Sequence, residues 1–303
     1  SRGLGDVYKR QICMKGYYNM DLTSPRTIRN IQEQFGFTFK KGLGQNFLTA
    51  RNILEEIVDA AEIESGVIEV GPGFGVLTSE LAQNSDKVVT IEIDERLIDV
   101  LDYTLAEYDN VKIINEDILK LDLKKVIDDE FNGEKVSIAA NLPYYITTPI
   151  ITKLLEEKLP IKNIVVMVQK EVAERMSAKP STKDYGAITV LCQYYTEPSI
   201  MANVPASLFV PPPKVDSAVL KLKVLDKPSV EVKDEGVFFR VVKAAFSQRR
   251  KTLLNCLSAN FPIPKDEIST LLESIGIAPS RRGETLSLEE FANIADTLLQ
   301  KIK

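Results

Sequence analysis

The sequence contains no histidine and no tryptophan, and only three cysteines occur among its 303 residues. Without histidine the chain cannot build a Ser-His-Asp triad, a histidine general base or a histidine-ligated metal site. Cys13, Cys192 and Cys256 never form a Cys-x-x-Cys pair, which argues against a zinc site and against a disulfide framework. We therefore expect no metal cofactor, no common hydrolase chemistry, and a reducing, cytoplasmic location.

Positive charge and long apolar runs are also scarce. The 38 Lys and Arg residues are outnumbered by 43 Asp and Glu residues, which gives a net charge of −5. A nucleic-acid partner would therefore have to be bound by local basic patches rather than by a generally basic surface. No apolar run approaches the roughly 20 residues needed to cross a bilayer, so we expect no membrane partner.

The pattern along the chain predicts an α/β domain followed by a small helical domain. We expect residues 1–19 to be a non-native or disordered extension, residues 20–228 to form the α/β domain, and residues 229–303 to form the helical domain. Within the first domain, helices and strands alternate, which is typical of βαβ units and a doubly wound, mostly parallel sheet. The predicted helices cover residues 21–39, 51–61, 77–83 and 95–105, and the predicted strands cover residues 67–70, 87–93, 111–115, 136–140, 164–168, 188–195 and 218–224.

A glycine-rich loop follows the first predicted strand of the sheet. The residues from Glu69 to Gly75 read Glu-Val-Gly-Pro-Gly-Phe-Gly, and Glu92 ends the next strand. The glycines allow a tight turn, and an acid at that distance can accept both hydroxyls of a ribose. The six-residue pattern of dinucleotide sites is absent, and Glu69 precedes the loop. These features favour a phosphate-free, cationic cofactor, S-adenosyl-L-methionine, with Asp117 accepting from its adenine amine or, alternatively, capping the following segment.

Asn141-Leu142-Pro143-Tyr144 follows the predicted strand 136–140. The Asn141 side chain and a nearby backbone carbonyl are hydrogen-bond acceptors that could hold the N–H groups of a planar amine, and Tyr144 could stack on a nucleobase. The alternative interpretation is a plain turn in which asparagine caps the next helix and proline stiffens the loop.

Together these motifs resemble the ribosomal RNA adenine N6,N6-dimethyltransferases, most closely the members that modify two adjacent adenines of 16S ribosomal RNA. The resemblance extends from about Phe39 to near the C-terminus, and includes 44–48, 69–75, 141–144, 169–172, 209–217 and 244–254. It implies a Rossmann-like methyltransferase domain over residues 20–228 and an RNA-binding role for the helical domain. It also implies a cofactor site at Gln45, Asn46, Leu48, Gly71, Gly73, Glu92, Ile93, Asp117, Ile118 and Asn141. The target adenine would be held by Asn141, Leu142, Pro143, Tyr144 and Phe209, with no covalent intermediate.

Basic residues give candidate contacts to RNA phosphates. Residues 236–264 include no acidic residue. Within this segment, five basic residues occur in the twelve positions 240–251. The candidates are Lys40, Lys41, Lys214, Arg240, Lys243, Arg249, Arg250 and Lys251, although a charged run is also typical of a solvated helix face.

The expected partner is 16S ribosomal RNA within an immature small ribosomal subunit, bound by a monomer. Two alternatives stay open. One is an Erm-type enzyme that methylates an adenine of 23S ribosomal RNA. The other is a ribosome-assembly factor in which methylation is dispensable.

Overall fold

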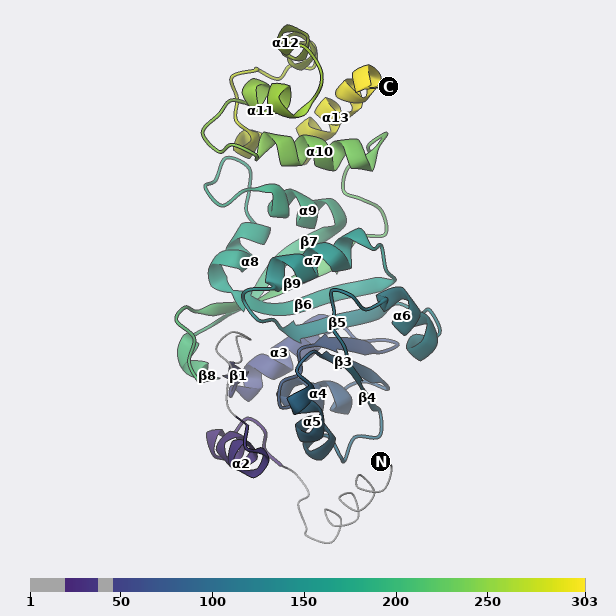
Figure 1. Cartoon of the computed structure of the whole chain (residues 1–303), viewed down its shortest axis with the longest axis vertical. Helices are drawn as coiled ribbons and strands as arrows, with labels where there is room; N and C mark the ends of the chain where they lie inside the picture. Colours follow the sequence, from purple (N-terminus) through teal and green to yellow (C-terminus); the bar gives the residue numbers. More distant parts are fainter. Residues whose placement is uncertain (1–19, 38–45, 303) are drawn as a thin grey trace. The chain divides into compact units, whose positions relative to one another are not determined.

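The computed structural model describes residues 20–37 and 46–302 (Figure 1). By its internal contacts the chain forms two compact units. The first comprises residues 1–153, 158–170 and 201–221, and the second comprises residues 154–157, 171–200 and 222–303. This division assigns part of the chain before residue 228 to the second unit, and the domain boundary at residue 228 stays a prediction.

The chain contains a seven-stranded sheet in the order β4-β3-β2-β5-β6-β9-β7, and strands β2 to β6 lie wholly within the first unit. Neighbouring strands among β4, β3, β2, β5 and β6 pair in parallel, which confirms the doubly wound, mostly parallel fold predicted from the sequence. The strands are β2 (Val67–Val70), β3 (Val88–Glu92), β4 (Val111–Asn115), β5 (Val136–Asn141), β6 (Ile161–Gln169), β7 (Thr196–Val204) and β9 (Ser217–Val224). Strands β2, β3 and β5 are buried along almost their whole length, as expected for strands covered on both faces.

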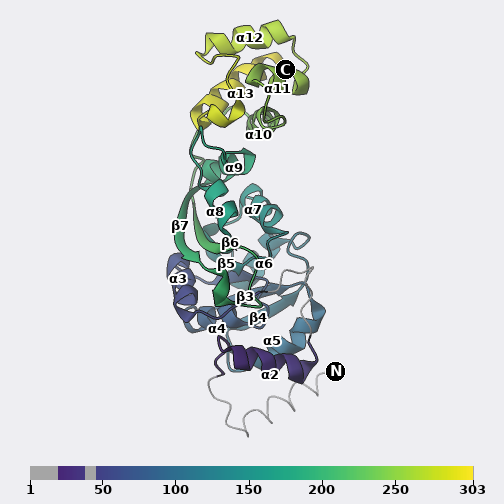
Figure 2. The same ribbon diagram turned by 90° about the vertical axis from the view of Figure 1, so that its left-hand side faces the viewer.

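Helices cover both faces of this sheet. In Figure 2, α3 (Arg51–Ala61) lies on one side of the central strands and α6 (Leu123–Phe131) on the other. The connecting segments also include α4 (Val76–Gln83), the short helix η2 (Glu95–Leu97), α5 (Ile98–Thr104) and α7 (Thr147–Glu156). Each parallel connection carries the chain back to the edge where the strands begin, so the carboxyl ends of β2, β3, β4 and β5 lie together at the opposite edge.

A separate two-stranded ladder joins two distant segments of the first unit. β1 (Phe47–Leu48) pairs antiparallel with β8 (Phe209–Val210), so that Leu48 lies opposite Phe209. The backbone N–H of Thr49 and its hydroxyl both donate to the Leu208 carbonyl, at 2.9 and 2.8 Å. The ladder fixes the backbone on the carboxyl side of Asn46.

The first helix is shorter than predicted. The sequence pattern indicated a helix over residues 21–39, but α2 begins at Pro25 and ends at Phe35. Gly36 adopts a left-handed conformation with φ 61°, and its N–H donates to carbonyls of the last turn. This glycine cap ends the helix, because a residue without a Cβ takes that conformation at little cost.

The predicted strand over residues 188–195 is wrong. These residues form the helix α9 (Ala187–Tyr195), and the strand β7 follows it directly. The Thr189 hydroxyl accepts from the N–H of Gly186 and closes the first turn. Side chains are buried around much of this helix, and a short apolar run buried in that way cannot be distinguished from a buried strand by periodicity.

Helices form most of the second unit. α8 (Lys170–Met176) and α9 precede α10 (Glu235–Ala245), α11 (Leu253–Asn260), α12 (Lys265–Ser274) and α13 (Leu288–Ile302), which confirms the helical C-terminal segment predicted from the sequence. The Tyr194 ring of α9 stacks on the Phe238 ring of α10, with centroids 4.8 Å apart. Across the described residues, every helix is too short or too polar to be a candidate for crossing a membrane.

Candidate active site

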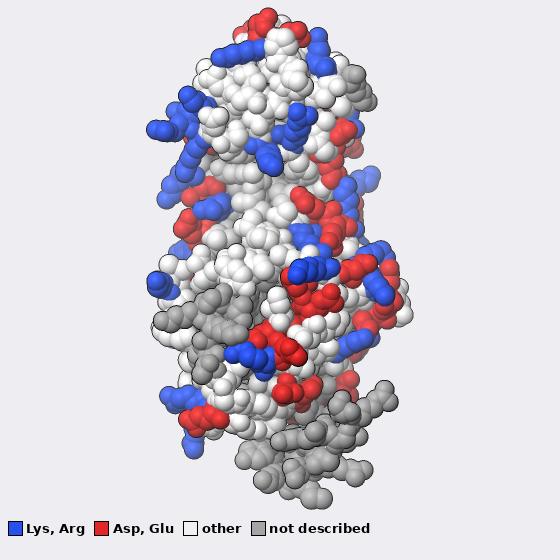
Figure 3. All heavy atoms as spheres, viewed as in Figure 1, with Lys and Arg blue, Asp and Glu red and all other residues white. Residues whose placement is uncertain are grey.

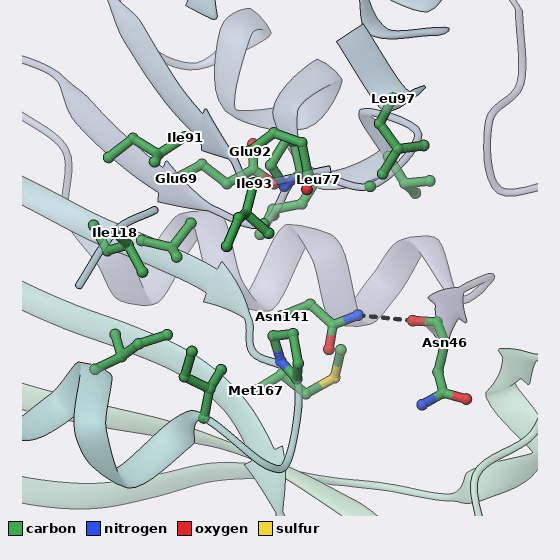
Figure 4. A pocket seen from close by; sticks show the side chains of 18 of the residues that line it. Asn46, Glu69, Leu77, Ile91, Glu92, Ile93, Leu97, Ile118, Asn141 and Met167 are labelled. Atoms are coloured by element: carbon green, nitrogen blue, oxygen red, sulfur yellow. Dashed lines mark hydrogen bonds between the residues drawn. The ribbon is translucent and has the colours of Figure 1, made fainter. Parts of the chain in front are cut away.

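One pocket lies at the carboxyl edge of the sheet, within the first unit. It encloses about 1030 Å³ of empty space, part of it open to solvent, which suits a small-molecule site. Ten of the residues predicted from the sequence to bind cofactor or substrate line it, and Figure 4 shows how several of them face one another. They are Asn46, Leu48, Gly71, Gly73, Glu92, Ile93, Asp117, Ile118, Asn141 and Pro143.

The glycine-rich loop forms the wall of the pocket after β2. Gly71 and Gly73 have φ values of +71° and +60°, which side chains with a Cβ rarely adopt. A Cβ on Gly73 would lie 2.8 Å from the Phe47 ring, whereas a Cβ on Gly71 would meet no atom within 4 Å. Gly71 therefore faces open space in the pocket, and Gly73 allows the loop to pack against β1.

Two buried carboxyl groups lie behind and beside this loop. Burial raises the pKa of Glu69 to about 8, although the Thr78 hydroxyl donates to it at 2.5 Å. Burial likewise raises the pKa of Glu92 to about 7, while the N–H of Asp94 donates to its Oε1 at 2.8 Å. Both carboxyl groups line the pocket; burial favours their neutral forms, and a bound cation would favour their ionised forms.

The ends of β3 and β4 add two apolar side chains and a third acid. Ile93 lines the pocket and is 54% exposed although it is apolar, and Ile118 is a buried residue of the lining. The Oδ1 atom of Asp117 accepts the N–H of Leu119 at 3.0 Å, so the capping role considered for this residue is present. Asp117 also lines the pocket.

Asn141, at the end of β5, is oriented by a neighbouring loop. Its Nδ2 donates to the backbone carbonyl of Asn46 at 3.0 Å, as the dashed line in Figure 4 shows. Its Oδ1 accepts no hydrogen bond from the described part of the chain, and neither does the carbonyl of Leu142. The N–H of Leu142 donates to Met167 at 3.1 Å, which fixes this peptide against β6. Two acceptors are therefore held in place beside the pocket.

The two aromatic rings predicted to stack on the target base are placed differently from each other. Tyr144 is half-buried outside the pocket lining, and its hydroxyl is hydrogen-bonded to the buried Ser217 hydroxyl at 2.8 Å. Phe209 is 3% exposed, lies opposite Leu48 in the ladder, and does not line the pocket. The stacking role of both residues stays a prediction.

Some predicted residues lie outside the described part of the chain, and some pocket residues were not predicted. Lys40, Lys41 and Gln45 belong to residues 38–45, and the extension 1–19 is likewise outside the described part of the chain.

Residues that line the pocket without having been predicted as a site include Phe47, Leu77, Leu97, Tyr145, Ile146, Ile150 and Met167. Two of these gave a signal in the sequence: Phe47 belongs to the motif 44–48, and Tyr145 is an aromatic residue directly after Tyr144.

The predicted basic residues near the C-terminus differ in how far they are engaged. Arg240 donates to the Asn260 carbonyl at 2.9 Å and stacks over the Phe261 ring, and Arg249 donates to the Lys183 carbonyl at 2.8 Å. The side chains of Lys243, Arg250 and Lys251 are exposed and form no ion pair with other described residues. Figure 3 shows Lys and Arg side chains at the left edge of the region around α10 and α11.

Lys214 is exposed in the loop between β8 and β9 of the first unit, as the predicted contact requires. Among the described residues, no group of three or more acidic or cysteine side chains is arranged to hold a metal ion.

A parallel sheet with a glycine-rich loop, an acid at the end of the next strand and paired acceptors beyond them is the arrangement predicted above for an S-adenosylmethionine-dependent methyltransferase, and comparisons with known proteins agree with that class. The model of one family, ribosomal RNA adenine dimethylase, matches residues 36–300. The chain belongs to this family, and the family predicted from the sequence is confirmed.

Curated and solved relatives agree with this assignment. The chain is 54% identical over 285 residues to "Ribosomal RNA small subunit methyltransferase A" of Bacillus mycoides, covering 92% of this chain and 98% of that protein. The protein of the same name from Bacillus cereus matches with the same identity and coverage. A dimethyladenosine transferase from Plasmodium falciparum has a TM-score of 0.68 at 29% identity, over 82% of this chain and 95% of that one. The 23S rRNA methyltransferase ErmE has a TM-score of 0.64 at 27% identity, and the match covers 84% of this chain and 100% of that one.

Proposed function

We propose that this enzyme transfers methyl groups from S-adenosylmethionine to N6 of two adjacent adenines in the 3′-terminal hairpin of 16S ribosomal RNA. The observation that carries the proposal is a pair of acceptors, Asn141 Oδ1 and the Leu142 carbonyl, that accept no hydrogen bond from the described residues and are held beside a pocket lined by Glu69 and Glu92. The 54% identity to proteins named small subunit methyltransferases favours 16S over 23S ribosomal RNA as the substrate.

The pocket residues fit the cofactor. Gly71 leaves open space at the turn, and Glu92 at the next strand end is placed to accept the ribose hydroxyls. Ile93 and Ile118 provide apolar surface for an adenine ring. The Oδ2 atom of Asp117, which lies 3.8 Å from the exposed Lys120 ammonium, is the oxygen proposed to accept from the adenine amine. When bound, the cofactor supplies an electrophilic methyl group on a sulfonium centre.

The target adenine is held by the segment that follows β5. Its exocyclic amine has two N–H groups, and Asn141 Oδ1 and the Leu142 carbonyl accept one each, which turns the nitrogen lone pair toward the electrophile. Tyr144 stacks on the base, and the hydrogen bond between its hydroxyl and that of Ser217 holds the ring in position for this contact. The alkylated amine is a strong acid and releases its proton to water, so no histidine is needed. Catalysis therefore depends on orientation and on fixed dipoles.

The proposed substrate also sets the expected partner and location. We propose that the enzyme acts as a monomer on an immature small subunit in the cytoplasm. Cys192 and Cys256 are buried free thiols, as a reducing compartment allows. The exposed basic side chains Lys214, Lys243, Arg250 and Lys251 are proposed contacts to phosphates.

The test is methyl transfer from labelled S-adenosylmethionine to unmodified small subunits and, separately, to large subunits, followed by mapping of the label. We expect dimethylation of two adjacent adenines near the 3′ end of 16S ribosomal RNA. Label in 23S ribosomal RNA instead would overturn the proposal in favour of an Erm-type enzyme. Subunit binding with no transfer to either RNA would favour an assembly factor.

A further inference from the structure

Two exposed large apolar side chains, Ile93 and Tyr145, line the pocket. Six such residues occur in the described part of the chain, and Ile93, Leu119, Tyr145 and Val215 lie on loops that follow strands of the sheet or precede β9. Isolated exposed apolar residues are ordinary on a protein surface, whereas exposed apolar residues that line a pocket indicate a binding surface. Tyr145 is the most exposed of the group, at 57%, and it lines the pocket.

A single turn presents Tyr145 and its neighbour Tyr144 in different environments. The N–H of Ile146 donates to the Pro143 carbonyl at 3.1 Å, which closes the turn, and the buried Thr147 hydroxyl donates to the same carbonyl at 3.3 Å. Tyr144 is half-buried and tethered to Ser217, whereas the Tyr145 hydroxyl has no hydrogen-bond partner among the described residues. The turn therefore holds the Tyr144 ring by a hydrogen bond and leaves the Tyr145 ring exposed to solvent.

We infer that Tyr145 is a stacking platform for the RNA base next to the adenine in the pocket. The inference rests on the proposed function, in which two adjacent adenines are modified in turn. While one adenine is held at Asn141, its neighbour lies one nucleotide away at the pocket mouth, where the exposed ring of Tyr145 stands. An aromatic side chain stacks on an unpaired base irrespective of the identity of that base. Tyr145 can therefore stack on whichever of the two adenines is not held at Asn141.

The competing role for Tyr145 is to cover the cofactor, since the same ring lines the pocket. The two roles predict different losses. A platform for RNA contributes to subunit binding and leaves cofactor affinity unchanged, whereas a cover contributes to cofactor affinity. Because the Tyr145 hydroxyl bonds to none of the described residues, phenylalanine at this position preserves either role, and leucine preserves apolar area without an aromatic face.

The experiment compares Tyr145→Ala, Tyr145→Leu and Tyr145→Phe with the wild-type enzyme. Two quantities are measured for each: the dissociation constant for S-adenosylhomocysteine, and the KM and kcat for methyl transfer to unmodified small subunits. Ile200→Ala is the matched control, because Ile200 is an exposed apolar residue on β7 that does not line the pocket. Retained binding of S-adenosylhomocysteine also shows that each variant is folded.

We expect Tyr145→Ala to raise the KM for small subunits by about 5- to 150-fold, the range found for loss of one base–aromatic stack. Tyr145→Leu should lose most of the same affinity, and Tyr145→Phe and Ile200→Ala should match the wild type. An unchanged KM in Tyr145→Ala, or a loss confined to S-adenosylhomocysteine binding, overturns the inference. Absence of transfer to small subunits by the wild-type enzyme would overturn the proposed function instead.

Discussion

The side-chain amide of Asn141 donates to the backbone carbonyl of Asn46 at 3.0 Å, which joins the end of β5 to a loop 95 residues earlier in the chain. This bond uses one amide proton and leaves Oδ1 as the atom available to a substrate. The carbonyl it uses immediately precedes β1, whose pairing with β8 fixes the loop. The orientation of the amide is therefore set before substrate binds, which is the preorganisation that catalysis by fixed dipoles requires.

Replacing Asn141 with alanine should abolish most methyl transfer and leave binding largely intact. By analogy with the removal of one fixed hydrogen-bonding group from an active site, we expect kcat to fall by about 10²- to 10³-fold. Binding of small subunits should change little, because phosphate contacts lie elsewhere. Single-turnover transfer and equilibrium binding measure the two effects. Unchanged turnover would contradict the assignment of Asn141 as an amine acceptor.

The Tyr144–Ser217 hydrogen bond gives a second prediction, suited to a double-mutant cycle. Tyr144→Phe and Ser217→Ala each remove the bond of 2.8 Å while keeping the ring in the chain. One hydrogen bond contributes about 1 kcal/mol, so each variant should lower kcat by roughly fivefold. The double variant should be no slower than either single one, since both break the same tether. Additive losses would show that the bond does not position the ring.

The strand-end positions of the site could be predicted from the sequence, but the bonds that orient them could not. Glu92, Asp117 and Asn141 each follow or end an apolar run, and parallel strands bring such positions to one edge. Ser217 is 73 residues from Tyr144, and only the fold places their hydroxyls together. The helix α9 was mistaken for a strand for a related reason, because its burial is set by tertiary packing.

Gly71 allows the pocket to be tested without disturbing its walls. Alanine at Gly71 would meet no protein atom within 4 Å, so its costs are the strain of φ +71° and the space it takes from a ligand. Gly36 is the matched control, since its φ is +61°, its surroundings are equally open, and it caps α2 away from the pocket lining. Both substitutions should cost about 1–2 kcal/mol of stability. Only Gly71→Ala should weaken binding of S-adenosylhomocysteine, by tenfold or more in calorimetry; equal affinities would place the cofactor elsewhere.

The exposed pair Arg250 and Lys251 should contribute to RNA affinity through phosphate contacts. Their joint replacement by alanine should weaken binding to small subunits and reduce the slope of log affinity against log salt concentration by roughly 0.7 to 1 per lost contact. The control is Lys124→Ala with Lys125→Ala on α6, which removes the same charge from another surface. If both double variants show the same slope as the wild type, the Arg250–Lys251 segment is a solvated surface.

Glu69 should make the ligand-free enzyme less stable as pH rises. Its folded pKa, about 8 because of burial, lies above the ordinary value of 4.5, so its contribution is fully present in acid and is lost as pH rises through 8. Relative to Glu69→Gln, the wild-type free energy of unfolding should fall by up to about 1.4 kcal/mol per pH unit between pH 5.5 and 7.5. Urea unfolding at those two pH values measures this difference. Glu130→Gln is the control. Hydrogen bonds from Lys112 and Lys87 lower the pKa of Glu130, so this substitution should change the pH dependence of stability only at pH values below 4.5. A wild-type slope no steeper than that of Glu69→Gln would show that Glu69 is already ionised in the folded protein at pH 5.5.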